Sequence, residues 1–155
     1  MRMTLLLIIL LSLLIITLSG CSTIRPVHTI KFENKPCLEP LEGFNYQTCA
    51  DLNVKIDGYP LTVPKGFETD LASIPRFLWA ILPPQQANFV APAILHDYFY
   101  IMGAGKRSDA DAILYASLRQ QGAMWLTANI IWLGVRLGGA HHFNKEAQNA
   151  GNRRL

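Results

Sequence analysis

The sequence predicts an α+β fold, in which a small N-terminal β-hairpin or sheet packs on a bundle of three to four helices. Residues 52–63 alternate apolar and polar side chains on both sides of Asp57-Gly58, the pattern of two strands joined by a tight turn. From residue 74 onward, apolar residues recur at helical spacing or cover a whole helix. The 155 residues suffice for one domain with a hydrophobic core.

The first twenty residues are typical of an export signal. Arg2 gives a positively charged start, and residues 4–18 form an uncharged run rich in Leu and Ile. A membrane-spanning helix needs roughly 20 apolar residues, whereas the core of a signal peptide needs about 7–15. The run therefore fits a signal peptide.

The sequence Leu18-Ser19-Gly20-Cys21 resembles the lipobox of bacterial lipoproteins, where cleavage leaves an acylated cysteine as the mature N-terminus. Several acyl chains, palmitate among them, anchor a protein stably, because each buried CH₂ contributes roughly 0.8 kcal/mol. The resemblance implies that Cys21 is lipidated. The residue after the cysteine is Ser22 and not Asp, which implies sorting of the protein to the outer membrane, facing the periplasm. An uncleaved short anchor and an ordinary cleaved signal are the alternatives.

The charge of the mature chain is nearly balanced. Without Arg2, 13 Lys and Arg residues stand against 11 Asp and Glu residues. This balance argues against a nucleic-acid partner, which needs a strongly basic patch. The expected organisation is a signal peptide at 1–20, a lipid anchor, tether and cysteine loop at 21–51, the α+β domain at 52–139 and a polar tail at 140–155.

Cys37 and Cys49 are expected to form a disulfide, because an exported compartment is oxidising. A metal site is the weaker alternative, since neither cysteine belongs to a CxxC pair or has a histidine nearby. Two prolines and a glycine predict that residues 34–48 form an irregular loop. The disulfide would close this loop.

The remaining elements follow from apolar patterning and capping residues. Residues 27–32 predict a further strand, and Pro60, which lacks an N–H, places the second strand of the hairpin at a sheet edge. Ser108 is expected to be an N-cap with Asp111 as the acidic partner of a capping box. The expected helices are residues 74–82 after an N-cap at Ser73, 89–102, 108–121 and 124–137.

The last expected helix carries two apolar stripes. One face contains Trp125, Asn129, Trp132 and Arg136, and the neighbouring face contains Leu126, Ile130, Leu133 and Leu137. Both stripes are interpreted as core. The alternative is that the tryptophan face meets lipid or a partner.

Four polar residues lie in otherwise apolar surroundings, where a charged group needs a partner: Asp70, His96, Asp97 and Asp111. Asp70, His96 and Asp111 are candidates for a catalytic acid–base site, or for the ligands of a divalent metal, because carboxylates and imidazole serve both purposes. Tyr100 shares a helix face with His96. No other cofactor is expected.

A structural role for these polar residues is the favoured interpretation. Asp111 would complement a helix N-terminus, and Asp70 would accept hydrogen bonds from backbone N–H groups. His96 and Asp97 would pair with a nearby arginine, at position 76 or 107.

Several motifs stand out in combination: GFETDLASIPR at 66–76, His96-Asp97, Arg107 with Asp111, and VRLGG at 135–139. Together they resemble the DUF1353 family, small phage and bacterial proteins of unknown function, over about residues 54–139. The resemblance implies a shared core, a shared site and a phage or prophage origin, and it supplies no activity. The lipobox and the Cys37–Cys49 segment are additions to the family pattern.

The leading hypothesis is a lipid-anchored bacterial envelope protein that acts by binding at the membrane face, for example in superinfection exclusion. Its expected partners are the membrane, through lipidated Cys21, and an outer-membrane or phage protein. One alternative is a metal-dependent or acid–base hydrolase of cell-wall material that uses Asp70, His96 and Asp111. Another is a structural envelope protein with a buried polar lock.

Overall fold

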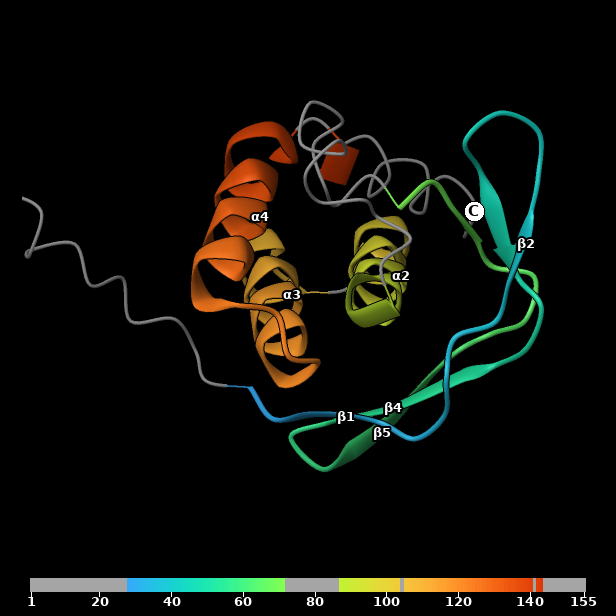
Figure 1. Ribbon diagram of the computed structural model, residues 1–155, viewed down its shortest axis with the longest axis horizontal. Helices are drawn as coiled ribbons and strands as arrows, with labels where there is room; N and C mark the ends of the chain where they lie inside the picture. The colour runs from blue at the N-terminus through green and yellow to red at the C-terminus, as the bar shows by residue number, and fades with distance from the viewer. Residues whose placement is uncertain (1–27, 72–86, 104, 141, 144–155) are drawn as a thin grey trace, which may run out of the picture.

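The computed structural model describes residues 28–71, 87–103, 105–140 and 142–143. In this part of the chain, two antiparallel three-stranded sheets are followed by three helices, which confirms the expected α+β class (Figure 1). The export signal, Cys21, the helix expected at residues 74–82 and the tail beyond residue 143 lie outside the described residues.

The first sheet contains the expected hairpin. Strands β4 (Leu52–Ile56) and β5 (Tyr59–Val63) pair with each other, and β1 (Ile30–Phe32) pairs with the other side of β4. Asp57 and Gly58 have φ angles of 52° and 87°, as a two-residue hairpin turn of type I′ requires. Strand β5 lies at the sheet edge, as Pro60 predicted.

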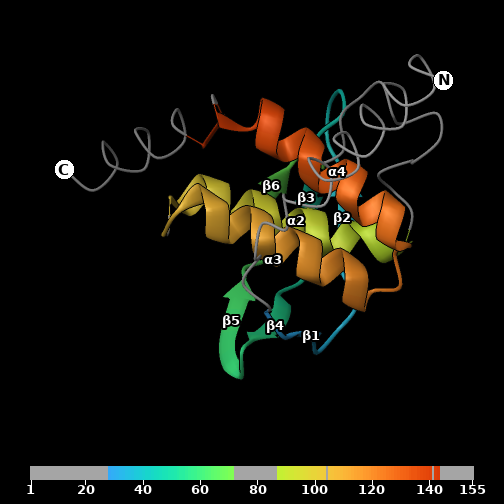
Figure 2. The same ribbon diagram turned by 90° about the vertical axis from the view of Figure 1, so that its left-hand side faces the viewer.

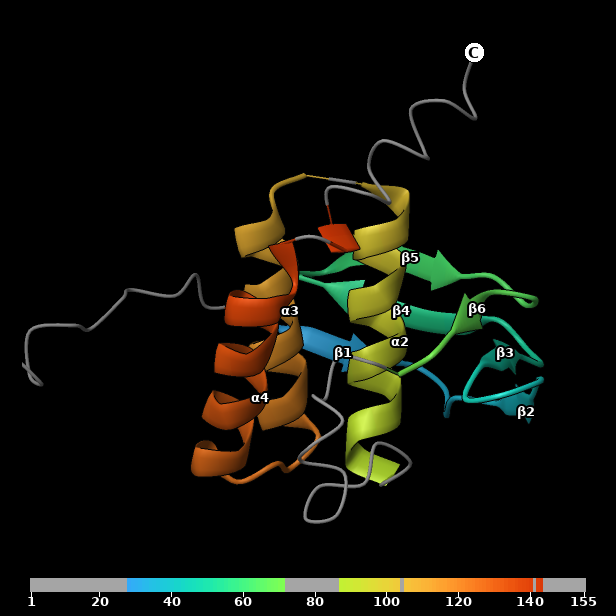
Figure 3. The same ribbon diagram turned by 90° about the horizontal axis from the view of Figure 1, so that it is seen from above.

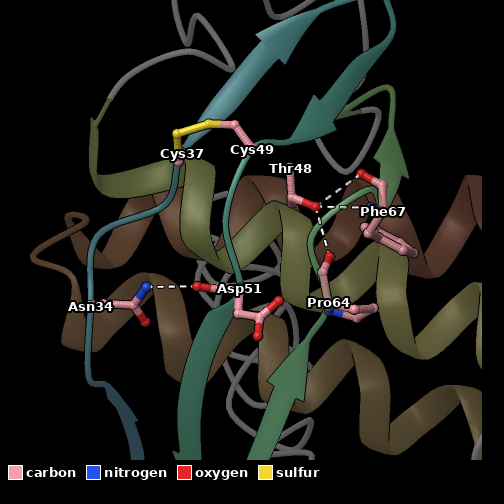
Figure 4. Close-up of a disulfide and its surroundings, with 7 residues drawn as sticks. All are labelled: Asn34, Cys37, Thr48, Cys49, Asp51, Pro64 and Phe67. Carbon is pink, nitrogen blue, oxygen red and sulfur yellow. Dashed lines mark hydrogen bonds between the residues drawn. A yellow bond between two sulfur atoms is a disulfide. The ribbon is translucent and has the colours of Figure 1, made fainter.

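A second sheet forms where an irregular loop was expected, so that expectation was wrong. Its strands are β2 (Leu38–Pro40), β3 (Tyr46–Thr48) and β6 (Glu68–Thr69), in the order β2-β3-β6. The disulfide between Cys37 and Cys49, which the sequence predicted, extends the β2–β3 pairing by one register position (Figure 4). Strands of two or three residues carry too little alternation to be seen in a sequence, and the disulfide supplies the constraint that pairs them.

The Thr48 hydroxyl holds the second sheet against the end of the first. This hydroxyl donates to the Pro64 carbonyl at 2.7 Å and accepts the Phe67 backbone N–H at 2.9 Å (Figure 4). Thr48 is buried, so the hydrogen bonds form in a protected environment. They fix the turn after β5 and deliver residues 68–71 to the helices.

The helices expected at residues 89–102, 108–121 and 124–137 are present as α2 (Ala87–Met102), α3 (Arg107–Gln120) and α4 (Trp125–Gly138). The expected cap of α3 was wrong. Lys106 is its N-cap and makes no side-chain capping hydrogen bond, while the Ser108 hydroxyl contacts Asp109 instead. The N-cap lies two residues before the expected one, so Asp111 is too far along α3 to complete a capping box.

The sheets and helices form layers. The β1-β4-β5 sheet covers one side of α2 and α3, and α4 packs on the outer side of α3 (Figures 2 and 3). One core cluster joins this sheet to α2 and α3 and includes Ile30, Leu52, Val54, Val63, Leu71, Ile94, Leu95 and Ile113. A second cluster lies between α3 and α4 and includes Phe89, Leu114, Leu118, Ala128, Ile131 and Val135.

Helix α4 buries a different face from the one that the sequence indicated. Its buried residues are Thr127, Ala128, Ile131 and Val135. The stripe formed by Leu126, Ile130, Leu133 and Leu137 is exposed, and the tryptophan stripe is exposed at Trp125 and half-buried beyond it. The interpretation of both stripes as core was wrong. Ala128, Ile131 and Val135 pack against Leu114 and Leu118 of α3, and the row of leucine and isoleucine side chains points outward. In the part of the chain that the structure describes, no helix has the length and apolar character needed to cross a membrane.

Candidate functional site

The Asp111 carboxylate lies at the centre of a buried polar cluster between α2, α3 and α4. Its Oδ1 accepts hydrogen bonds from the Tyr100 hydroxyl at 2.6 Å and from His96 Nε2 at 3.0 Å. Its Oδ2 accepts a hydrogen bond from a guanidinium nitrogen of Arg136 at 2.9 Å. These four side chains, named here the Asp111 cluster, join three helices through one carboxylate.

Helical spacing explains why α2 supplies two of the donors. His96 and Tyr100 are four residues apart and share a face, and their ring centroids are 4.2 Å apart. Gly139, which directly follows α4, leaves room for the Tyr100 hydroxyl, because a Cβ atom at Gly139 would lie 2.6 Å from it. The rings of Phe143 and Tyr100 form a T-shaped contact, with their centroids 5.2 Å apart.

The donors keep Asp111 ionised although it has no exposed surface. Burial alone raises the pKa of a carboxyl group, because it disfavours the charged form. The hydrogen bonds from His96, Tyr100 and Arg136 outweigh burial and hold the pKa of Asp111 below its ordinary value. Asp111 is therefore an ionised carboxylate, and both of its oxygens accept hydrogen bonds from side chains inside the protein.

The pKa values of its two partners on α2 are both raised. Burial by itself lowers the pKa of His96, but the interactions with Asp111 and Asp97 outweigh it, so the net shift is upward. For Tyr100, burial and the Asp111 carboxylate raise the pKa well above its ordinary value, and Arg107 opposes this shift in part. The cluster thus favours a protonated His96 and a neutral Tyr100.

A second polar contact joins the stretch after β6 to α2. The Thr69 hydroxyl donates to Oδ2 of Asp97 at 2.5 Å and accepts the backbone N–H of Leu71 at 3.1 Å. Leu71 is fully buried and has a φ of 53°, a left-handed conformation that costs a residue with a side chain roughly 1–2 kcal/mol. The hydroxyl and the burial of Leu71 hold this conformation. Oδ1 of Asp97 also lies 3.8 Å from Nδ1 of His96, close enough for electrostatic attraction.

Arg107 secures the end of α4 from the first turn of α3. Its guanidinium donates to the carbonyl oxygens of Val135 and Arg136 at 3.3 and 3.2 Å. The last carbonyl groups of a helix lack partners in the helix and carry its partial negative charge. Arg107 therefore stabilises the helix end that presents the Arg136 side chain to Asp111.

The structure brings together two of the three candidate site residues by direct contact, namely His96 and Asp111. Asp70 directly follows β6 and is half-buried. The expectation that Asp111 complements a helix N-terminus was wrong, because Asp109 is the acidic residue in the first turn of α3 and the Asp111 carboxylate contacts side chains of α2 and α4. Among the described residues, no group of three or more His, Cys, Asp or Glu side chains is arranged to hold a metal ion.

Two members of the Asp111 cluster were not among the candidates from the sequence. Tyr100 shares a helix face with His96, which could have indicated it. A tyrosine in an apolar helix is, however, usually buried because its ring contributes to the core. Arg136 had a clearer signal, since it is the only charged residue in the otherwise apolar helix α4. The Arg136 guanidinium pairs with Asp111, whose fully buried carboxylate needs an opposite charge.

The fold and the cluster define a class of small α+β domain in which one buried carboxylate joins three helices. The sequence model of DUF1353, a family described as proteins of unknown function, matches residues 46–135, which is more than half of the chain. The protein belongs to this family. The matched range contains His96, Tyr100 and Asp111, and it ends one residue before Arg136. Comparison with curated proteins and with solved structures finds no match.

Proposed function

We propose that the protein is a lipid-anchored component of the bacterial envelope, of phage or prophage origin, that acts by binding at the membrane face. The observation that carries this proposal is the apolar run at residues 4–18 followed directly by Leu18-Ser19-Gly20-Cys21. Cleavage before Cys21 and acylation of its thiol leave the α+β domain attached to the membrane by a short tether. The disulfide between Cys37 and Cys49 is consistent with an oxidising compartment.

The Asp111 cluster supports a binding protein better than a hydrolase. A general acid or base must lie within hydrogen-bond reach of the bond that it acts on. His96 and Asp111 are only 3% and 0% exposed, and each is hydrogen-bonded to the other. Their contacts join α2 to α3 and, through Arg136, to α4. We infer that the cluster keeps the helices in register and that binding takes place on the surface they present.

The anchor is tested by mass spectrometry of the full-length protein expressed in a bacterium and extracted from its membrane fraction. The expected N-terminal peptide begins at Cys21 and carries the mass of the acyl chains. Replacement of the thiol in Cys21→Ser should abolish acylation, while Ser22→Ala should leave it intact. An unmodified Cys21 in a protein that is still retained by the membrane would contradict the anchor.

Within this proposal, superinfection exclusion is the specific role that fits the membrane location and the phage association implied by the family resemblance. A lipoprotein at the envelope can block a surface receptor against a second phage. The test compares a lysogen with its deletion strain for sensitivity to a panel of phages. Increased sensitivity to at least one phage, reversed by the intact gene and not by the Cys21→Ser variant, is expected. Unchanged sensitivity to every phage would contradict this role.

A further inference from the structure

Helix α4 presents a large apolar surface on the side that faces away from α3. The residues of this surface, named here the α4 outer face, are exposed by 38–78%: Met124, Trp125, Leu126, Ile130, Leu133 and Leu137. Four of them recur at i, i+4, i+7 and i+11 from Leu126, which places them along one side of the helix. Exposed apolar residues are common singly, but a continuous row on one helix indicates an interaction surface.

The core does not need these side chains. The opposite side of α4 already fills the space against α3 with Ala128, Ile131 and Val135. The apolar side chains of the outer face are exposed to water, which is unfavourable, and they belong to neither core cluster in the described part of the chain. A surface of this kind fits an occupant that is itself apolar.

The point at which the chain enters the domain indicates what this occupant is. The Gln120 side chain, at the end of α3, hydrogen-bonds to the His28 carbonyl at 3.0 Å and to the Ile30 backbone N–H at 2.9 Å. The start of β1 is thereby fixed beside the turn that leads into α4 (Figures 1 and 2). Met124 and Trp125, the first residues of the outer face, follow directly after this turn.

The tether is too short to hold the domain far from its anchor. Seven peptide units separate Cys21 from His28, so this stretch of chain spans at most about 25 Å. The length of α4 is about 21 Å, from 14 residues at about 1.5 Å each. An acylated Cys21 would thus keep the N-terminal end of the α4 outer face within one helix length or so of the lipid surface.

We propose that the α4 outer face lies on the phospholipid bilayer to which Cys21 is attached, as a second membrane contact. This inference rests on the proposed lipid anchor. An apolar helix face buries itself about 5–10 Å into the boundary between headgroups and acyl chains, with the helix axis in the membrane plane. Exposed tryptophan suits this depth, because its ring is apolar and its N–H group can reach water. The contact fixes the orientation of the domain, so that the two sheets face away from the lipid.

The test uses two positions with the same exposure. Leu137, on the outer face, and Tyr59, in the hairpin across the helix layer, are both 78% exposed. Leu137→Cys and Tyr59→Cys are each labelled with an environment-sensitive fluorophore in the full-length, membrane-extracted protein. Each is then reconstituted into vesicles of phosphatidylethanolamine and phosphatidylglycerol, with and without nitroxide-labelled lipid. Leu126→Cys serves as a second position on the outer face.

The labels at positions 137 and 126 are expected to be quenched by nitroxide lipid at least threefold more strongly than the label at position 59. Equal quenching of the three labels, or quenching confined to position 59, would overturn the inference. A label at position 137 that is shielded from water only as the protein concentration rises, and not by lipid, would also overturn it. In that case a second copy of the chain would occupy the face. Mass spectrometry of the same samples separates the two proposals: acylated Cys21 with no lipid contact at position 137 refutes the helix contact alone, and unmodified Cys21 refutes the anchor.

Discussion

Asp111 and Arg136 form a hydrogen-bonded ion pair at 2.9 Å, in which the carboxylate is fully buried and about a third of the arginine side chain is exposed. The arginine thus neutralises a core charge while its own charge remains partly hydrated. Because Tyr100 and His96 occupy the other oxygen, the ion pair is one part of a network that spans α2, α3 and α4. Networks of this kind are coupled, so the loss of one member affects the others.

Removing the charge of Asp111 should destabilise the protein strongly. In Asp111→Asn the side chain keeps its shape, but Arg136 loses its counter-charge and the amide presents N–H groups to a donor. Breaking a buried pair in this way costs about 3–5 kcal/mol. We expect a loss of roughly 3 kcal/mol in the free energy of unfolding, measured by urea denaturation followed by circular dichroism.

Asp109→Asn is the matched control for this variant. Asp109 lies in the same helix and is exposed, and its carboxylate accepts a hydrogen bond from the neighbouring Ser108 hydroxyl. Its replacement should change the unfolding free energy by a small fraction of the effect at Asp111. Similar losses in the two variants would mean that negative charge near the start of α3, rather than the cluster, is what stabilises the helices.

Stability should also depend on pH through His96. Its pKa is raised in the folded protein, so its contribution is complete below the unfolded value of about 6.5 and is lost as pH rises through the higher folded value. The lowered pKa of Asp111 acts at the other end, since its contribution is lost as pH falls through the folded value. Urea midpoints measured from pH 5 to pH 9 should therefore decline on the alkaline side.

The comparison that isolates His96 is with His96→Gln, which cannot titrate. This variant should be less stable at pH 6, and its decline between pH 6 and pH 9 should be clearly shallower than that of the native protein. If both proteins show the same slope, another group causes the decline, and the protonated His96 has no part in it.

The elements with strong periodicity could be predicted from the sequence. The Asp57-Gly58 turn between alternating strands, and the apolar helices that became α2, α3 and α4, have local signals that tertiary contacts do not overturn. The pairing of Cys37 with Cys49 followed from the number of cysteines and the expected compartment. By contrast, β2, β3 and β6 have two or three residues each and exist because distant segments meet.

The members of the Asp111 cluster could not all be predicted without knowledge of the fold. His96 and Asp111 stood out as polar residues in apolar helices, but 25 residues separate Asp111 from Arg136, and periodicity within one helix does not say which helix lies opposite. The same limit explains the error on α4. Its sequence is apolar on several sides, and only the packing of Ile131 and Val135 against α3 determines that Leu133 and Leu137 point outward.

The contact between Thr69 and Asp97 should be sensitive to the hydroxyl rather than to the size of the side chain. Thr69→Val keeps the volume but removes the donor to Asp97 and the acceptor for the Leu71 N–H. Leaving such buried groups unsatisfied costs roughly 1–3 kcal/mol. Thr69→Ser keeps the hydroxyl and loses one methyl group, about 0.8 kcal/mol when buried. In thermal unfolding, Val is therefore expected to lower the melting temperature more than Ser; the reverse order would show that packing dominates at this position.

Gly139 should be required for the position of Tyr100, whereas the adjacent Gly138 should not. A Cβ atom at Gly139 would lie 2.6 Å from both the Tyr100 hydroxyl and the Val135 carbonyl oxygen, while a Cβ atom at Gly138 meets nothing within 4 Å. Overpacking of this kind costs about 1–3 kcal/mol. We expect Gly139→Ala to destabilise the protein by that amount. Gly138→Ala should instead stabilise it by about 0.5–1 kcal/mol, because alanine restricts the unfolded chain and favours the helix.

A double-variant cycle connects the Gly139 effect to the Asp111 cluster. Tyr100→Phe removes the hydroxyl that the new Cβ atom would displace, and by itself it should cost roughly 1.5–3 kcal/mol, because the hydroxyl donates to a charged group. In the Tyr100→Phe background, the Cβ atom added by Gly139→Ala no longer clashes with the hydroxyl. The loss of unfolding free energy in the double variant should therefore be smaller than the sum of the losses in the single variants. Urea denaturation of the four proteins measures this coupling energy. Additive losses would mean that Gly139→Ala acts through the Val135 carbonyl oxygen alone and leaves the hydrogen bond from Tyr100 to Asp111 in place.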